Sequence, residues 1–470
     1  MISTSTRPRR PARSRSAAAG AAPRHSAPAA WCVASGTASA SRGERLKVVR
    51  LANYVAPASG GLRTALRELG SGYLAAGHES VLVIPGPKPG RRYSEQGLVI
   101  TVPGRRIPAL GGYRAITQRH SLRQLLDRLE PDRLEVSDRT TLRWTGPWAR
   151  ARGIRSMMVS HDSLAGLMRM FGPPVLPVSR VADRLNRATA ASYDVIVCTT
   201  AWAAAEFRRL NVPNLVQVPL GVDLACFHPR HQDASLRSRL APDGRSLLVH
   251  CSRLSPEKRP ERALGALAEL LRRGVPAVLV VAGDGPLRRW LQSKAEGLPV
   301  RFLRHIADRG LLARLLATAD VALAPGPVET FGLSAMEALA SGTPVVVSCR
   351  SALPELIGQA GLAAEDDDVS CADAVESLLR RDPVERRTAA RAQAERYSWP
   401  IAVDGFLSAH GLSRVPRTAN GTHVAVAGRA AGGDPGTVEP MTPGLALDGA
   451  GGASLSVIGA QPSGLDGCLR

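Results

Sequence analysis

Short runs of apolar residues alternate with helical patterns along most of the chain. The first run, residues 47–52, is followed by a polar loop, a helical pattern from Leu62 to Ala76, and a second apolar run at residues 81–84. Alternation of this kind predicts parallel strands joined by helices. The chain is therefore expected to have an α/β fold of the doubly wound type.

The same alternation continues and predicts two Rossmann-like domains, at residues 46–227 and 245–397. A chain of 470 residues is long enough for both. The polar, breaker-rich stretch 228–244 predicts a linker between them, and residues 398–412 a terminal helix. Later elements are expected as strands at 133–137, 156–160, 194–198, 216–219, 247–251, 278–282, 300–303, 320–324 and 345–347, and as helices at 113–130, 311–319 and 372–409.

The charge is strongly positive but unevenly placed. The formal net charge is +21, and residues 1–45 hold eight arginines against one glutamate. Low complexity at both ends predicts disordered extensions at 1–45 and 413–470. A basic nucleic-acid-binding protein remains the alternative to an enzyme. It is disfavoured because aromatic residues make up 4% of the chain and no nucleic-acid-binding module is recognisable.

The cysteines and the apolar runs exclude further classes. The seven cysteines show no paired spacing, which argues against a zinc site or a disulfide framework. No apolar run approaches the roughly 20 residues that span a bilayer. The N-terminus lacks the apolar segment of a secretion signal. We therefore expect a protein of the cytoplasm.

Residues 327–347 read as loop, helix, glycine stop and strand, directly after the apolar run 320–324. Gly332 allows a tight turn into the helix, whose first backbone amides would face an anion. Glu329 lies before the helix and Glu337 about two turns inside it. Backbone amides can bind phosphates, and carboxylates accept hydrogen bonds from sugar hydroxyl groups. A site that has both indicates a nucleotide sugar as ligand. Alternatively, a glutamate near a helix start is merely favourable to the helix dipole.

A basic cluster follows the strand at 247–251. Pro260 is expected at the first position of a helix, which places Lys258 and Arg259 at its positive end. That placement is unfavourable unless an anion neutralises it. With Arg253 on the preceding loop, the cluster predicts a clasp for a diphosphate; the alternative is a solvated surface.

Other candidates follow the ends of predicted strands. Gly60 and Gly61 do not form the dinucleotide-binding Gly-x-Gly-x-x-Gly pattern, but they allow close approach of a phosphate or a sugar, or make a plain turn. His161 is expected to contact the transferred sugar, unless it only pairs with Asp162. Gly283 begins another glycine turn. No Asp-x-Asp lies near a strand end, so no metal is expected, and residues 366–368 are expected on the surface.

The stretch around Phe331-Gly332-Leu333, with Glu329 and Glu337 eight residues apart and Ala-Leu-Ala-Ser-Gly-Thr-Pro-Val-Val after Glu337, resembles the donor site of the retaining glycosyl transferases group 1 family. The resemblance covers residues 46 to about 410. It implies the two-domain GT-B fold, in which the terminal helix crosses back to the first domain. It also implies transfer with retention of configuration by front-face attack.

The resemblance also implies roles for the candidate residues. Glu337 would bind the ribose, Glu329 the sugar hydroxyls, and residues 304–306 the base. Arg253, Lys258 and the amides of Phe331, Gly332 and Leu333 would bind the donor phosphates. His161 would contact the sugar or the acceptor. The backbone would approach the nucleotide closely at Gly60, Gly61 and Gly283.

Within this family the segments 49–55, 59–66 and 135–138 are similar to actinobacterial mannosyltransferases of phosphatidylinositol mannosides. This similarity implies GDP-mannose as donor and a glycolipid or other glycan acceptor. Alternatives are a UDP-glucose or UDP-GlcNAc donor, a soluble acceptor, or a nucleotide-sugar epimerase. The predicted helix 113–130 carries arginines beside an apolar face; it packs on the sheet or docks on an anionic membrane, at the inner face of the plasma membrane.

Overall fold

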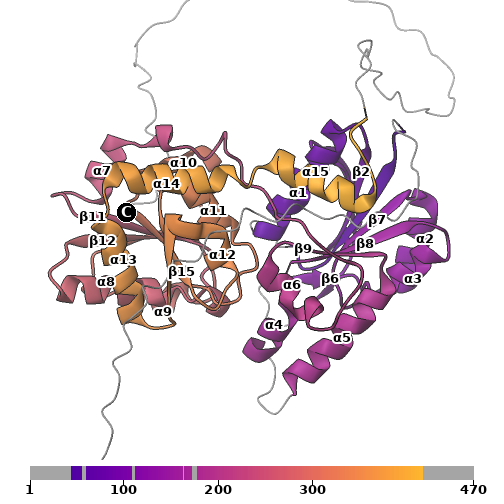
Figure 1. Cartoon of the computed structure of the whole chain (residues 1–470), viewed down its shortest axis with the longest axis horizontal. Coiled ribbons are helices and arrows are strands. Elements are labelled where there is room, and N and C mark those ends of the chain that lie inside the picture. The colour runs from indigo at the N-terminus through magenta and orange to yellow at the C-terminus, as the bar shows by residue number, and fades with distance from the viewer. Residues whose placement is uncertain (1–43, 56–59, 108–111, 162, 172–176, 416–470) are drawn as a thin grey trace, which may run out of the picture. The chain divides into compact units, whose positions relative to one another are not determined.

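A computed structural model describes residues 44–55, 60–107, 112–161, 163–171 and 177–415 (Figure 1). Most of the predicted extensions 1–45 and 413–470 lies outside the described residues. The described chain builds two separate main sheets. We call the parts around them the N-terminal lobe, with β1 to β10, and the C-terminal lobe, with β11 to β16. The exact domain boundaries remain a prediction.

In the described residues of the N-terminal lobe the sheet has eight strands, in the order β10-β9-β8-β7-β1-β2-β4-β3. Its neighbours run parallel, except for the antiparallel pair of β3 and β4. The strands are β1 Lys47–Ala52, β2 Glu79–Gly86, β3 Gly90–Ser94, β4 Gly97–Pro103, β7 Arg133–Ser137, β8 Arg155–Ser160, β9 Val195–Cys198 and β10 Leu215–Gln217, with a separate antiparallel pair, β5 Arg105–Arg106 and β6 Arg114–Ala115. The helices are α1 Gly61–Ala75, α2 Arg119–Leu129, α3 Thr145–Arg150, α4 Leu164–Phe171, α5 Val178–Ser192 and α6 Ala201–Arg208.

The sheet of the C-terminal lobe has six described strands, all parallel, in the order β13-β12-β11-β14-β15-β16. They are β11 Ser246–Cys251, β12 Ala277–Ala282, β13 Val300–Leu303, β14 Val321–Ala324, β15 Val345–Ser348 and β16 Gly361–Ala364. The helices are α7 Ala234–Leu240, α8 Glu261–Arg272, α9 Arg288–Lys294, α10 Arg309–Thr318, α11 Leu333–Ala340, α12 Leu353–Ile357, α13 Asp368–Leu379, α14 Pro383–Glu395 and α15 Trp399–His410, with 3₁₀ turns η1 Pro229–His231, η2 Pro256–Lys258 and η3 Gly358–Ala360.

The strands form because their apolar runs are covered on both faces. Every residue of β12 is buried, and β1 is buried from its second residue onward. In parallel sheets the connecting helices cover both faces, so the strands are buried on both sides and consist mostly of apolar residues. The predicted strands were thus correctly placed to within about two residues. The strands β3, β4, β5, β6 and β16 were missed, because they are short or lack a long apolar run.

The final helix, α15, returns to the N-terminal lobe, as the fold resemblance implied (Figure 1). A side chain at Gly72 of α1 would collide with Val403 of α15. The guanidinium of Arg133 donates a hydrogen bond of 3.0 Å to the carbonyl of His410. The His410 ring lies 3.2 Å from the buried carboxylate of Glu135. Packing and polar contacts together hold this helix to β7 and α1.

Three predicted segments differ from the observed elements. The helix expected at 113–130 is confined to α2, because residues 114–115 instead pair with β5. The linker expected at 228–244 contains α7, whose Leu236 and Leu240 are fully buried. The helical stretch 372–409 is broken at Ser398, as the predicted terminal helix at 398–412 requires, and also between α13 and α14, because Asp382 caps a new helix that starts at Pro383.

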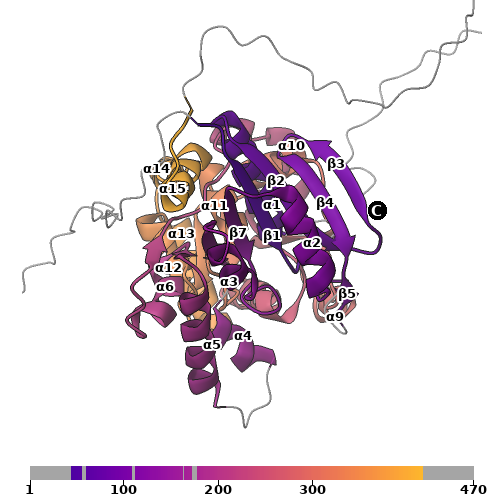
Figure 2. The same ribbon diagram turned by 90° about the vertical axis from the view of Figure 1, so that its right-hand side faces the viewer.

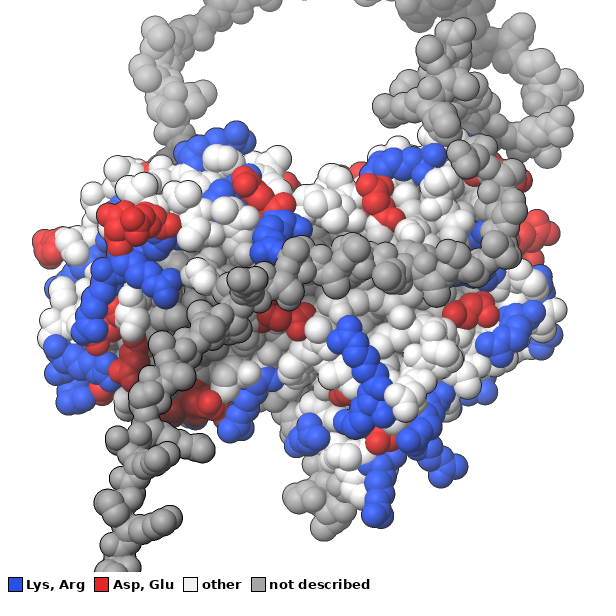
Figure 3. All heavy atoms as spheres, viewed as in Figure 1, with Lys and Arg blue, Asp and Glu red and all other residues white. Residues whose placement is uncertain are grey.

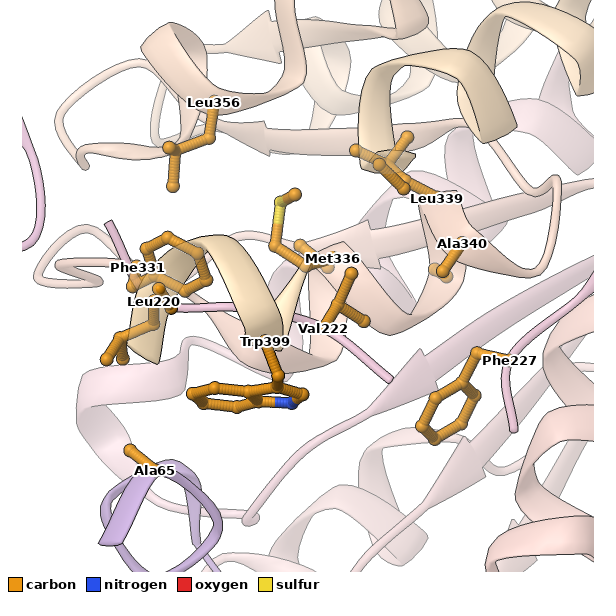
Figure 4. Close-up of a cluster of buried hydrophobic side chains, with 14 of the residues drawn as sticks. Ala65, Leu220, Val222, Phe227, Phe331, Met336, Leu339, Ala340, Leu356 and Trp399 are labelled. Atoms are coloured by element: carbon orange, nitrogen blue, oxygen red, sulfur yellow. The ribbon is translucent and has the colours of Figure 1, made fainter. Parts of the chain in front are cut away.

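The passage from one sheet to the next is buried beneath α11 (Figure 4). Leu220, Val222 and Phe227 lie in one apolar cluster with Phe331 and Trp399. A side chain at position 221 would collide with the backbone of Trp399. This packing fixes the loop before α11, from which the candidate site is built.

Candidate functional site

The loop between β14 and α11 has the conformation that the glycine predicted. Gly332 caps α11 with φ of 62°, in the left-handed region that glycine tolerates. The Phe331 side chain is buried and packs edge-on against Tyr397, with 6.1 Å between the ring centroids. The aromatic ring therefore anchors the loop, while the first amides of α11 have no acceptors within the helix. Only the backbone of Phe331 is suited to bind an anion.

Glu329 and Lys258 form an ion pair at this loop. The ammonium of Lys258 donates a hydrogen bond to the Glu329 carboxylate, and both side chains are about three-quarters buried or more. The pair joins η2 to the loop before α11. Residues that lie 71 positions apart in the sequence are thus brought together, as the proposed site requires.

Arg253 also has partners in the absence of any ligand. Its guanidinium donates a 2.6 Å hydrogen bond to Glu257 and another to the hydroxyl of Tyr113, over whose ring it lies at 5.3 Å. The anions that the sequence analysis expected beside the cations of this basic cluster are, in the structure, carboxylates of the protein, and diphosphate binding remains a prediction. These carboxylates already balance the positive charge, so a bound diphosphate would have to exchange with them.

Arg259 does not join the clasp. Its backbone adopts the left-handed conformation, and its side chain pairs with Asp366 and Glu261. Asp366 also accepts from Arg262, which pairs in turn with Asp368. Residues 366–368 are therefore structural ion-pair and capping residues. Among the described side chains, no group of three or more histidines, cysteines, aspartates or glutamates is arranged to hold a metal ion; that the protein needs no metal remains a prediction.

The double glycine lies at the start of α1, facing α11. Gly60 caps α1 with φ of 133°. A Cβ placed on Gly61 would lie 3.5 Å from the Leu333 side chain, in ordinary contact. Residues 56–59 lie outside the described structure. The amino-terminal ends of α1 and α11 therefore lie close together, and the free amides at helix starts are suited to bind anions.

His161 follows β8 and touches both sides of this junction. Its Nε2 lies 3.0 Å from the hydroxyl of Ser137, and its carbonyl accepts a hydrogen bond from the hydroxyl of Thr330, next to Glu329. Asp162, the predicted alternative partner, lies outside the described residues. The backbone of His161 thus contacts the residue next to Glu329, while contact of either residue with a sugar remains a prediction.

Glu337 lies within α11, and Gly283 lies against Ser252, the residue before Arg253. Burial raises the pKa of the Glu337 carboxyl to about 7, an effect that Asp223 increases and Arg309 opposes. Gly283 has φ of 152°, and a side chain there would collide with the carbonyl of Ser252. The close approach of these two backbone segments therefore requires glycine at position 283, whether or not a nucleotide is bound.

Family models match both lobes of this chain. Residues 60–221 match a glycosyl transferase 4-like domain, and residues 245–381 match glycosyl transferases group 1. A Mycobacterium tuberculosis protein named GDP-mannose-dependent alpha-(1-6)-phosphatidylinositol dimannoside mannosyltransferase is 48% identical over 375 residues, covering 79% of this chain and 97% of the relative. The chain belongs to the glycosyl transferases group 1 family.

Further comparisons agree on this family and on the GT-B fold. A GDP-mannose-dependent alpha-mannosyltransferase of Mycolicibacterium smegmatis is 30% identical, covering 70% of this chain and 88% of that protein. The solved sucrose-phosphate synthase of Thermosynechococcus elongatus has a TM-score of 0.62 at 21% identity, covering 76% of this chain and 96% of its own. Anabaena HepE in complex with UDP-glucose has a TM-score of 0.60 at 16% identity, covering 77% and 100%. The predicted GT-B architecture and the glycosyltransferase class are confirmed.

Two neighbours of this glycosyltransferase site were missed in the sequence. Tyr113 reaches Arg253 from the other lobe, and nothing in its surrounding sequence indicates this. His250 is buried at the end of β11, where burial lowers its pKa to about 4. Its Nδ1 lies 2.9 Å from the Leu323 carbonyl and must carry the proton, since a carbonyl only accepts. A histidine within an otherwise apolar strand, near its carboxyl end, was the available signal.

The pKa of Glu337 predicts a pH dependence of donor binding. If its carboxylate accepts hydrogen bonds from the ribose, the ionised form binds better. With a pKa of about 7, lowering the pH from 8 to 6 should weaken binding of a nucleotide sugar roughly tenfold. Calorimetric titration of the wild type and of Glu337→Gln measures this. The glutamine variant should bind more weakly with a flat profile, and an equal slope in both proteins would refute the assignment.

Proposed function

We propose that this glycosyltransferase moves mannose from GDP-mannose to a hydroxyl group of a phosphatidylinositol mannoside. The main support is the relative that is 48% identical to this chain. The alignment covers 97% of that relative, and its name gives this donor and this class of lipid. The pairing of Lys258 with Glu329 in the loop before α11, with Arg253 on the loop that leads into η2, supports a donor that combines a diphosphate with a sugar. GDP-mannose is a substrate in this proposal, and no metal or resident cofactor takes part.

In the proposed mechanism the bond between the anomeric carbon and the phosphate oxygen breaks while the acceptor oxygen attacks from the same face. The acceptor proton passes to the departing phosphate, and configuration is retained. Lys258, Arg253 and the amides of residues 331–333 stabilise the charge that grows on the diphosphate. Donors preorganised in this way commonly supply the largest contribution to catalysis. Glu329 and His161 orient the mannose, and Glu337 holds the ribose.

The donor assignment is tested by thermal shift. GDP-mannose should raise the unfolding temperature clearly more than UDP-glucose, UDP-GlcNAc or ADP-glucose at the same concentration. The reason is that a ligand stabilises the folded protein more, the more tightly it binds the folded state. A larger shift with a UDP sugar would overturn GDP-mannose as donor.

The same purified protein, given labelled GDP-mannose with and without phosphatidylinositol mannoside, should transfer label only to the lipid. Consumption of the donor without the lipid acceptor, with release of free sugar product, would instead favour an epimerase.

A lipid acceptor implies contact with a membrane, at the inner face of the plasma membrane in a cytoplasmic protein. No helix in the described parts of the chain has the length and apolar composition to cross a bilayer. The apolar face of α2 is turned towards the lobe, with Leu122, Leu125 and Leu126 buried, and is not available for insertion into a bilayer. Its arginines remain exposed, so the contact in this proposal is electrostatic.

Liposome co-sedimentation tests this contact. Removing three charges from α2, by replacing Arg119, Arg123 and Arg128 with glutamine, should weaken binding to anionic vesicles, at about 1 kcal/mol per arginine. The matched control removes Arg180, Arg184 and Arg187 of α5, where arginines also gather on the surface (Figure 3). Binding that does not depend on anionic lipid, or that is lost equally in both variants, would contradict a role for α2.

A further inference from the structure

An apolar groove of about 410 Å³ lies between β4 and α2, beside the turn that leads into β3. In Figure 2, α2 lies alongside β4 at this edge of the lobe. Ile100, Ile116, Leu122 and Leu125 form a buried apolar floor. The volume is within the range of about 300–1,000 Å³ that is common for ligand pockets. The groove is therefore large enough for part of a ligand.

The rim of the groove is basic. Arg91 of β3 and Arg128 of α2 are both exposed and both line it. An apolar channel bordered by guanidinium groups suits a molecule that joins a hydrocarbon chain to a phosphate. A phospholipid has this chemistry, whereas a soluble glycan has no part that would enter the apolar floor.

The groove is linked to the candidate active site through residues 113–116. At one end of this segment the Tyr113 hydroxyl accepts from Arg253. At the other end Ile116 lines the groove, and its amide donates a 2.8 Å hydrogen bond to the side chain of Asn53. Asn53 follows β1, on the path to the double glycine of α1. A ligand in the groove therefore lies one short segment away from the proposed donor phosphates.

We propose that this groove binds an acyl chain of the lipid acceptor, while the sugar head group reaches the junction of α1 and α11. The inference rests on the proposed lipid acceptor. It adds a specificity site outside the donor machinery. Each methylene group that enters the groove should strengthen acceptor binding about fourfold, so a diacyl acceptor should be used much better than the same glycan without acyl chains.

Filling the groove tests the proposal. Ser121 is exposed, lines the groove and lies on α2, so Ser121→Phe should narrow it without disturbing the core. The control Gln124→Phe places the same ring on an exposed position of the same helix outside the lining. With the diacyl acceptor, Ser121→Phe should lower kcat/KM at least tenfold. With the deacylated glycan both variants should remain within twofold of wild type. Equal effects on both acceptors, or no effect, would overturn the proposal.

A second readout separates this proposal from the proposed function. A phospholipid with a photoreactive acyl chain, in detergent micelles, should crosslink to residues 97–103 or 119–129 of the wild type and of Gln124→Phe, and much less to Ser121→Phe. Crosslinks elsewhere, or crosslinks unchanged in Ser121→Phe, would refute the groove. If the crosslinks are as expected but no sugar moves from any nucleotide donor to the lipid, the proposed transfer fails and the lipid site stands.

Discussion

Replacing Lys258 with alanine is expected to lower sugar transfer by a factor of 10² to 10³. The ammonium would stabilise negative charge on the departing diphosphate, and its loss also leaves the Glu329 carboxylate without the partner it has in the structure. Glu329→Ala should have a comparable effect, because it removes the carboxylate proposed to accept hydrogen bonds from the sugar hydroxyls. Turnover of the donor with the lipid acceptor, measured at saturating substrate, gives both values.

Both variants should fold normally, since neither side chain belongs to the apolar core. Lys294→Ala and Glu296→Ala are suitable controls, because these residues have the same chemistry but lie exposed on and after α9, away from the site. Circular dichroism and unfolding temperature should match the wild type in all four proteins. Wild-type turnover in Lys258→Ala or Glu329→Ala would refute the assigned roles.

The second large effect is expected on stability, from Glu135→Ala. The Glu135 carboxylate is buried, accepts a 2.7 Å hydrogen bond from Tyr73 and lies 3.2 Å from the His410 ring. Arg50, fully buried nearby, depends on it for charge balance. Removing one member of a buried charge pair typically costs about 3–5 kcal/mol. Urea unfolding should therefore show a markedly lower midpoint.

Two further variants separate charge from packing at this position. Glu135→Gln keeps the shape but not the charge, and should recover only part of the loss. The double change Arg50→Met with Glu135→Leu removes both charges and should be more stable than Glu135→Ala. If Glu135→Ala unfolds at the wild-type midpoint, the network does not hold α15 to the N-terminal lobe.

Much of the fold could be predicted because it depends on local patterns. Apolar runs such as residues 278–282 are long enough to identify buried parallel strands, and Gly332 indicated a turn into a helix that the structure contains. The extent of the helix at 113–130 could not be predicted, because its first residues form a strand with partners outside the local pattern. The division between α13 and α14 does have a local signal, because Asp382 followed by Pro383 is a typical start of a helix.

For the candidate site, sequence patterns could nominate residues but not their pairings, and the roles of these residues remain predictions. Lys258 and Glu329 were both identified, yet their mutual ion pair joins two loops that only the folded chain brings together. Arg259 was placed beside the phosphate clasp, but its left-handed backbone turns the side chain towards Asp366. Tyr113 reaches Arg253 from the other lobe, a contact that depends on the tertiary structure alone.

The most direct test of the central claim is a crystal structure of the protein with GDP-mannose bound. We expect the diphosphate to lie within hydrogen-bonding distance of Lys258, Arg253 and the amides of residues 331–333, with the mannose beside Glu329 and the ribose beside Glu337. A nucleotide sugar bound away from the meeting point of α1 and α11, with the Lys258–Glu329 pair untouched, would contradict the account.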